Sequence, residues 1–278
     1  MASPLLPTRG PVHPLFSDPA ADAVLRSKQG TLYRIPAFLL RDSCARLRQL
    51  RPSDIPLPVP ENDQALERFL RMISGLEVPV WDSFDDFESV LALAETWDAA
   101  GPLSLLRSAA TTPLFLQEPI RLYGLASRMK WDEERKTASM FTLSLSIYET
   151  EYSSQLQLLT SHDLLDLLLL HRTRRDEFQA RIDAESMFSA GNAVHYLCSG
   201  CAAEIDNHAW RTLKLRMVLE LDKRPLGDTL MELLDEWPEA LACWSASCPN
   251  SGCGMLYYDK AATLREVRAC LQQLPSTV

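Results

Sequence analysis

Two short cysteine pairs are the residues of this sequence best suited to chemistry. Cys198 and Cys201 enclose a Ser-Gly dipeptide, and Cys248 and Cys253 enclose Pro-Asn-Ser-Gly. Each pair could bind one edge of a tetrahedral Zn²⁺ site, because the glycine between the cysteines helps the backbone turn until both sulfurs face one ion. The spacing therefore predicts a structural zinc site formed by Cys198, Cys201, Cys248 and Cys253.

Alternatives to this zinc site stay open at the level of the sequence. The 46 residues between the pairs (202–247) are a long insert for a small zinc module, so free and partly buried thiols are the competing interpretation. Three further residues are candidate substitute ligands: Cys243, His195 and His208. A catalytic zinc would need an open ligand position and an adjacent general base, and the chain has no His-Glu-x-x-His motif. A structural role is therefore expected rather than a catalytic one.

A run of basic residues could form an anion site. His171 is followed by Arg172, Arg174 and Arg175. Charge runs of this kind more often form the solvated face of a helix, and this second interpretation is favoured.

Other catalytic arrangements find little support in the sequence. His162 and Asp163 lie where a helix cap is expected, so capping is favoured over a catalytic dyad. The chain carries no motif of a phosphate-binding loop, a nucleophile elbow or a dinucleotide-binding fold. We therefore expect a non-enzymatic protein, with a Cys/His-dependent enzyme as an alternative.

The composition is that of a globular protein without a large basic surface. Hydrophobic residues make up 46% of the 278 residues, and 28 Lys and Arg stand against 37 Asp and Glu. The net charge of −9 argues against a large nucleic-acid footprint and against binding to anionic membranes, because both need clustered basic residues. A zinc-stabilised regulator that touches nucleic acid is therefore the weaker alternative to a protein-binding function.

The cysteine count and the N-terminus predict an intracellular protein. Seven cysteines, an odd number, point away from a disulfide framework. The first fifteen residues contain four prolines and no apolar run long enough for a secretory signal. The longest apolar cluster, residues 164–170, is too short to span a membrane. Nucleus and cytoplasm are not distinguished.

The N-terminal part predicts a small sheet with helices. Residues 1–15 are expected to be a disordered, proline-rich lead, and residues 23–35 a β-hairpin. A helix should start at Pro36. Residues 55–59 alternate with prolines, which is compatible only with an edge strand. Two further helices are expected over 62–73, with a capping residue at its start, and from Ser83 to a stop at Gly101.

The remainder predicts helices almost throughout. A helix pair is expected at 118–129 and 132–144, and a long helix at about 160–185, with further helices at about 203–221, 226–236 and 260–274. The leucine-rich start of the long helix should be buried on nearly all sides. Its later turns, which carry Arg172, Arg174 and Arg175, should emerge into solvent.

The order hairpin, helix, edge strand and helix pair resembles the BTB/POZ domain. Residues 18–27 (DPAADAVLRS) resemble the family's opening strand, and residues 33–43 (YRIPAFLLRDS) resemble its following helix segment. Ile55-Pro56-Leu57 and then residues 66–73 (LERFLRMI) are similar to the next stretch. A subfamily abundant in mushroom-forming fungi continues with segments similar to 118–128 (EPIRLYGLASR) and 168–175 (LLLHRTRR), and tends to carry two C-terminal cysteine pairs.

This resemblance implies an α+β fold and a domain organisation. Residues 16–115 would form the BTB/POZ domain, a small β-sheet flanked by helices. Residues 116–278 would form a mostly α-helical region with the cysteine pairs.

The same resemblance implies a protein–protein interaction module, an adaptor or scaffold linked to transcription or to a ubiquitin ligase. Its partners would be another BTB chain or a cullin-type scaffold, with no nucleic acid and no membrane. Many dimeric members swap an N-terminal helix and strand, for which only about fifteen residues precede the expected core. Heterotypic binding is therefore expected, and a homodimer is left open.

Overall fold

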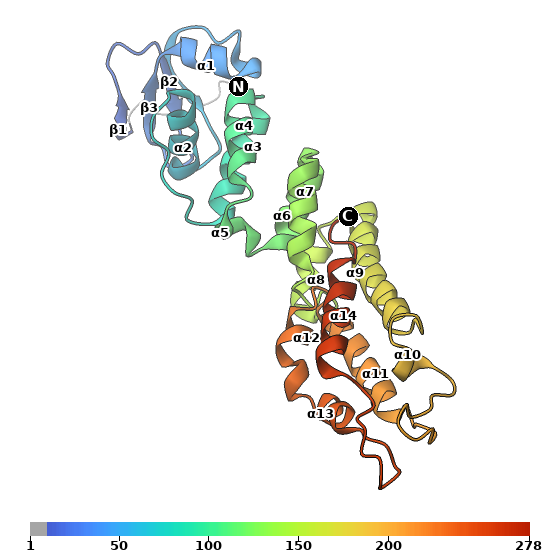
Figure 1. The fold of residues 1–278 in the computed structure, drawn as a ribbon. Coiled ribbons are helices and arrows are strands. Elements are labelled where there is room, and N and C mark those ends of the chain that lie inside the picture. The colour runs from blue at the N-terminus through green and yellow to red at the C-terminus, as the bar shows by residue number, and fades with distance from the viewer. Residues whose placement is uncertain (1–9) are drawn as a thin grey trace. The chain divides into compact units, whose positions relative to one another are not determined.

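The computed structural model describes residues 10–278, and the chain divides into two compact units between residues 117 and 118. The N-terminal unit carries a four-stranded sheet, and fourteen α-helices are distributed over the described parts of the two units (Figure 1). The fold is therefore α+β. Within residues 10–278, no helix combines the length and the apolar character needed to cross a bilayer.

The sheet of the N-terminal unit has the strand order β1-β3-β2-β4. Its strands are β1 (Val12–Ser17), β2 (Ala23–Arg26), β3 (Leu32–Ile35) and β4 (Ser53–Pro58). The predicted antiparallel hairpin of β2 and β3 is confirmed, with Gly30 in its turn at a φ of 93°. β4 lies at the edge of the sheet, parallel to β2, as its prolines predicted.

The strand β1 corrects the expectation that residues 1–15 form a disordered lead. This strand pairs in parallel with β3. The ring of His13 stacks on that of Tyr33 at a centroid distance of 4.7 Å, and Phe16 is buried beside them. Aromatic packing against the sheet therefore orders a segment that its prolines suggested was irregular. Residues 1–9 of the expected lead lie outside the described part of the chain.

Five α-helices are described in the N-terminal unit: α1 (Ala37–Ser43), α2 (Asp63–Ile73), α3 (Phe84–Thr96), α4 (Ala100–Ala109) and α5 (Pro113–Leu116). The predicted cap of α2 is confirmed, since the side chain of Asn62 accepts a hydrogen bond from the N–H of Ala65. The prediction of one helix from Ser83 to Gly101 is wrong. Asp98 adopts a left-handed conformation with a φ of 51°, so the chain turns there and Gly101 belongs to α4.

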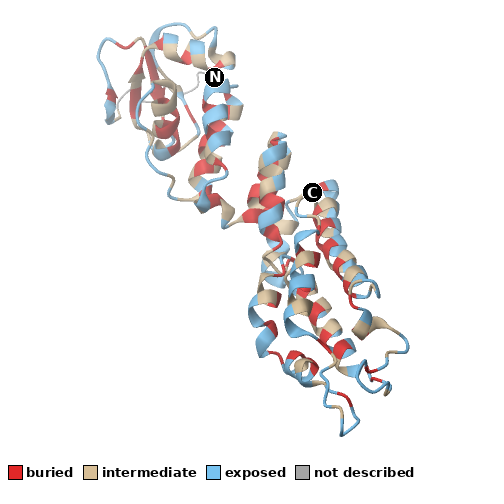
Figure 2. Ribbon diagram, in the orientation of Figure 1, coloured by how far each residue is buried: buried red, intermediate tan, exposed pale blue. Residues whose placement is uncertain are grey.

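The C-terminal unit consists of helices α6 (Pro119–Met129), α7 (Asp132–Thr142), α8 (Ser153–Leu156), α9 (Ser161–Ile182), α10 (Ser189–Asn192), α11 (His208–Lys223), α12 (Asp228–Leu233), α13 (Pro238–Ser245) and α14 (Lys260–Gln272). The predicted pair α6 and α7 is confirmed, with left-handed Lys130 between the helices. Buried residues follow the inward side of the longer helices (Figure 2). The core of this unit gathers around Phe178, Trp210 and Met217.

Two expectations for α9 are wrong. Its leucine-rich start is not buried on all sides, because Leu165 and Leu169 are exposed. Arg174, expected in solvent, has only 4% of its surface exposed. Its guanidinium has no carboxylate partner among the described residues. Instead it donates hydrogen bonds to four backbone carbonyls, those of Pro225 (2.6 Å), Leu226 (3.3 Å), Leu274 (3.4 Å) and Pro275 (2.7 Å).

Candidate metal centre

Two loops at one end of the C-terminal unit carry the four predicted cysteine ligands. The first cysteine loop (residues 196–205) precedes α11, and the second cysteine loop (residues 246–257) follows α13. α13 packs against α11, so the chain leaves the first loop and returns to the same end of the unit before entering the second (Figure 1). The long insert between the cysteine pairs is therefore a set of helices that brings the two loops together.

Each loop is a tight hairpin of the same design. An antiparallel bridge joins Leu197 to Glu204 in the first loop, and another joins Ser247 to Leu256 in the second. In both loops the residue directly after the second cysteine is left-handed: Ala202 has a φ of 59° and Gly254 a φ of 58°. The backbone thus turns back at the same point of each loop, which places both of its cysteines on one side.

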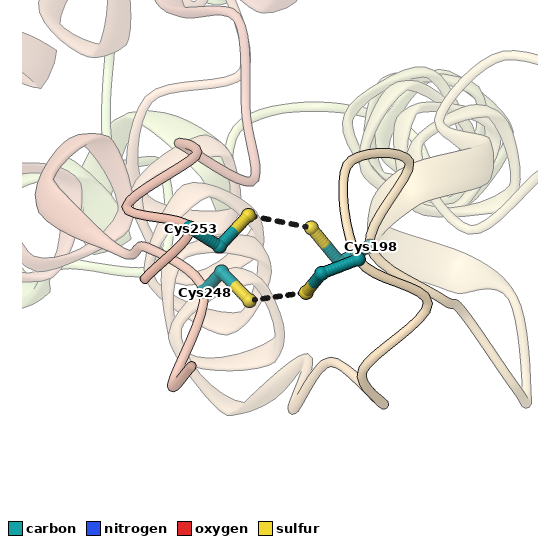
Figure 3. Close-up of side chains that lie close together, drawn as sticks. Cys198, Cys248 and Cys253 are labelled. Carbon is teal, nitrogen blue, oxygen red and sulfur yellow. Dashed lines mark hydrogen bonds between the residues drawn. The ribbon is translucent and has the colours of Figure 1, made fainter. Parts of the chain in front are cut away.

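The structure brings the four predicted sulfurs together. All four Sγ atoms lie within 4.8 Å of one another. The Sγ atoms of Cys198 and Cys253 are 3.6 Å apart, and those of Cys201 and Cys248 are 3.4 Å apart (Figure 3). Zn–S bonds of about 2.3 Å in a tetrahedron place neighbouring sulfurs about 3.8 Å apart. A disulfide would need about 2.05 Å. The four thiols therefore have the spacing of a tetrahedral metal site and not that of formed disulfides.

Backbone N–H groups point at the sulfurs from within each loop. The N–H groups of Gly200 and Cys201 donate to the Sγ of Cys198, and those of Asn250 and Met255 donate to Cys248 and Cys253. Hydrogen bonds of this kind stabilise a thiolate over a thiol. They lower the pKa of Cys198 to about 7, with the N–H of Gly200 as the largest contribution. At Cys248 the N–H of Asn250 also lowers the pKa, but burial and the neighbouring cysteines raise it to about 12. The pKa of Cys253 is likewise raised, because Cys198 and burial outweigh the N–H of Met255. The loops therefore favour the charged, metal-binding form at Cys198.

Gly200 lies where the two loops approach each other closely. A Cβ atom at this position would lie 3.1 Å from the Sγ of Cys253, 3.5 Å from the Sδ of Met255 and 3.9 Å from the Sγ of Cys198. A side chain here would therefore crowd the Sγ of Cys253, while its distances to the other two sulfurs are ordinary contacts.

The apolar support of the cysteine loops is small. Only Cys198, Ile205 and Cys248 are buried in this cluster, with Tyr196 and Tyr257 among the partly buried residues that pack on it. The main core of the unit, around Trp210, is a separate and much larger cluster. Apolar burial of this extent supplies little stability of its own, so the loops depend on what the four sulfurs bind.

The two left-handed positions allow a matched test of the loop geometry. Ala202→Gly should stabilise the protein by about 0.5–1 kcal/mol, because glycine removes the cost of a Cβ atom in the left-handed region. Gly254→Ala should destabilise the protein by about 1 kcal/mol, because it places a Cβ atom on a left-handed residue. No steric clash adds to this cost, since no atom lies within 4 Å of the new Cβ position. Urea unfolding of both variants measures these changes, and shifts in the same direction would contradict the explanation.

The three candidate substitute ligands do not join the cluster. Cys243 is fully buried in the main core of the C-terminal unit. His195 is exposed, with its Nδ1 3.6 Å from Glu204, and His208 is exposed at the start of α11.

The other singled-out histidines have structural surroundings. Capping at the start of α9 is confirmed, because the N–H of Asp163 donates to the Oγ1 of Thr160. His162 is solvent-exposed beside this cap. His171 is buried, and its Nε2 lies 3.1 Å from the Oγ1 of Thr142. Burial is the main cause that lowers the pKa of His171 to about 4, and the positive charge of Arg174 lowers it further.

The arginine run near His171 is neither an anion site nor a uniformly solvated face. Arg172 is exposed and pairs with Asp176, and Arg175 pairs with Asp222 and Asp176. Arg174 is buried with its donors on backbone carbonyls. The sequence did not indicate that backbone carbonyls would surround Arg174, because they belong to segments 51 to 101 positions away.

No protein-family model matches the chain, and a search of curated proteins gives no match. The candidate site is therefore interpreted from its own geometry.

Proposed function

We propose that Cys198, Cys201, Cys248 and Cys253 bind one structural Zn²⁺. The observation that carries this proposal is the mutual distance of the four Sγ atoms, none above 4.8 Å, in loops that also direct N–H groups at the sulfurs. Four cysteines fill all the positions of a tetrahedral ion, which supports a structural role, because catalytic zinc keeps a position open for water or substrate.

Elemental analysis of the untagged full-length protein tests this proposal. We expect about one zinc per chain, lost on denaturation in the presence of a chelator. A tetrahedral sulfur site also suits iron, so iron is measured in the same sample. Protein that carries neither metal, even after refolding with added Zn²⁺, would contradict the proposal.

We also propose that the N-terminal unit is a protein-interaction module of the BTB/POZ type, and that the chain is a non-enzymatic adaptor or scaffold. The observation that carries this proposal is the element order. The hairpin β2–β3 is followed by α1, the edge strand β4 and the helix pair α2 and α3, which is the order on which the resemblance rests. The proposed partner is another protein chain, either a BTB chain or a cullin-type scaffold.

An apolar groove in the N-terminal unit is suited to such a partner. It is lined by side chains that include Met72, Val80, Trp81, Leu105 and Leu114. Val80 is 87% exposed and Leu105 is 53% exposed. Exposed apolar residues gathered at one place are typical of protein-binding surfaces.

The wall of this groove is held in place by a buried arginine. Arg68 donates to the carbonyls of Pro79 (2.7 Å) and Val80 (3.0 Å) and pairs with Asp82 at 2.7 Å. Its guanidinium also stacks on the ring of Trp81, 5.0 Å from the centroid. A surface that is fixed before binding loses less entropy when a partner docks.

Val80→Glu should abolish binding of a BTB or cullin-type partner, because a carboxylate cannot enter an apolar interface without cost. The fold should be kept, because the exposed side chain of Val80 makes few internal contacts. Pull-down with candidate partners, quantified by mass spectrometry, measures the loss. Leu158→Glu is the matched control, since Leu158 is 85% exposed and lies in the other unit. Equal recovery of partner by wild type and Val80→Glu would contradict a role for the groove.

A further inference from the structure

Two short sulfur–sulfur contacts of the cluster cross from one loop to the other. Cys201 of the first loop is 3.4 Å from Cys248 of the second, and Cys198 is 3.6 Å from Cys253. Figure 3 shows the two cross-loop contacts side by side. To become a disulfide, each pair of sulfurs has to approach by only about 1.5 Å, given an S–S bond of about 2.05 Å.

Each cross-loop pair joins a more exposed cysteine to a buried one. Cys201 is exposed and Cys253 is partly exposed, whereas Cys248 is 7% and Cys198 is 4% exposed. Oxidants reach accessible thiolates first, and a disulfide then forms with a second thiol held nearby. The arrangement thus supplies, in each pair, one sulfur that can be oxidised and one that can resolve the product.

We propose that the four-cysteine cluster is also a site of reversible oxidation, at which hydrogen peroxide converts it into the disulfides Cys201–Cys248 and Cys198–Cys253 and so releases the metal. This inference rests on the proposed zinc site for the release step only, because the pairing of the sulfurs does not depend on which metal they hold.

The reaction balances for each disulfide with one peroxide. The Cys201 thiolate attacks one oxygen of the peroxide, the O–O bond breaks, the second oxygen leaves as hydroxide, and Cys201 becomes a sulfenic acid. The Cys248 thiolate then attacks the sulfenic sulfur, the S–S bond forms, and a second hydroxide leaves. Two protons from solvent convert both hydroxides to water. The two sulfurs lose two electrons, which the peroxide gains, and the Zn²⁺ ion keeps its charge.

One disulfide is enough to expel the ion. After Cys201 and Cys248 are joined, only Cys198 and Cys253 remain as thiolate ligands, and two ligands do not hold a structural zinc site. The remaining pair, freed from the ion, can then close in the same way. Since both disulfides cross from one loop to the other, the oxidised protein keeps the two hairpins joined without metal.

The remaining cysteines serve as internal controls. Cys44, Cys243 and Cys270 are buried and lie outside the four-cysteine cluster. Peroxide has poor access to buried thiols, so these three should stay reduced while the cluster is oxidised.

The test treats the full-length protein with about two equivalents of hydrogen peroxide per chain, the amount that two disulfides consume. Zinc release is followed with a chromogenic chelator, and disulfides are mapped by non-reducing proteolysis and mass spectrometry. We expect loss of most of the zinc, linked peptides for Cys201–Cys248 and Cys198–Cys253, and restoration of both thiols and metal by dithiothreitol with added Zn²⁺. Linkage within a loop, such as Cys198–Cys201, or oxidation to sulfinic acid alone would overturn the proposal.

A variant and a metal-free arm separate this inference from the zinc proposal. Metal-free Cys201→Ser protein should form only Cys198–Cys253 and keep Cys248 reduced, whether or not the wild type binds zinc. Zinc that is present at one per chain but stays bound while the thiols resist peroxide would end the oxidation proposal and leave the metal site intact. Cross-loop disulfides in a protein that never binds metal would support the oxidation proposal and contradict the zinc site.

Discussion

Replacing Cys198 by serine should remove the bound zinc and lower the melting temperature of the C-terminal unit by about 6–12 °C. The cysteine loops bury only three residues of their own, so metal binding supplies most of their folding free energy. A loss of about 3 kcal/mol corresponds to a shift of this size in a domain of 150–250 residues. The loops should unfold first, because the core around Trp210 is formed mainly by residues outside them, with only Ala246 and Tyr257 of the second loop packed against it.

Differential scanning calorimetry and hydrogen exchange measure this change. Protection should disappear in the two cysteine loops and persist in α9 and α11. Cys243→Ala is the matched control: this cysteine lies in the same unit, is fully buried, and is not in the cluster. It should cost about 1 kcal/mol from lost packing and keep one zinc per chain. A Cys198→Ser protein that retains its zinc and its melting temperature would contradict the proposed role of the metal.

The four cysteine ligands could be predicted from the sequence, but the helix packing and the loop conformation that bring them together could not. Short spacing within each pair suffices to expect a turn that aligns two sulfurs. The long insert weakened that prediction. The number of residues between the pairs does not show that α11 and α13 pack side by side, which brings the chain back to the first loop. The left-handed conformation of Ala202 was also hidden, since alanine does not favour it. The sequence placed the turn at the glycines between the cysteines, Gly200 and Gly252, whereas the left-handed residues are Ala202 and Gly254.

Regular elements were predictable where local signals agreed with packing. The Asn62 cap located the start of α2, and the prolines of β4 placed this strand at an edge. The errors occur where distant contacts outweigh local preference. β1 is ordered by aromatic rings on a neighbouring strand, and Asp98 interrupts an otherwise continuous apolar pattern through its backbone conformation. Neither effect can be inferred from nearby residues.

Arg174 is another position where distant contacts outweigh the local preference. Charged residues in a helix normally face solvent, but this guanidinium replaces water with four carbonyls from two distant segments. One segment follows α11 and the other follows α14. The side chain therefore ties both of them to α9.

Arg174→Ala should destabilise the protein by about 3 kcal/mol, because the four carbonyls lose charged donors and some stay buried without partners. Arg174→Lys should recover only part of this loss, since an ammonium has three donors on a flexible stem and lacks the planar fork of arginine. Urea unfolding of the C-terminal unit measures both variants. Arg172→Ala is the matched control two positions earlier: its side chain is 69% exposed, so the change should stay within about 0.5 kcal/mol. Equal effects of the two alanine substitutions would show that the carbonyl shell contributes nothing specific. A large loss at Arg174 alone would show that segments far apart in the sequence are held together by one buried cation.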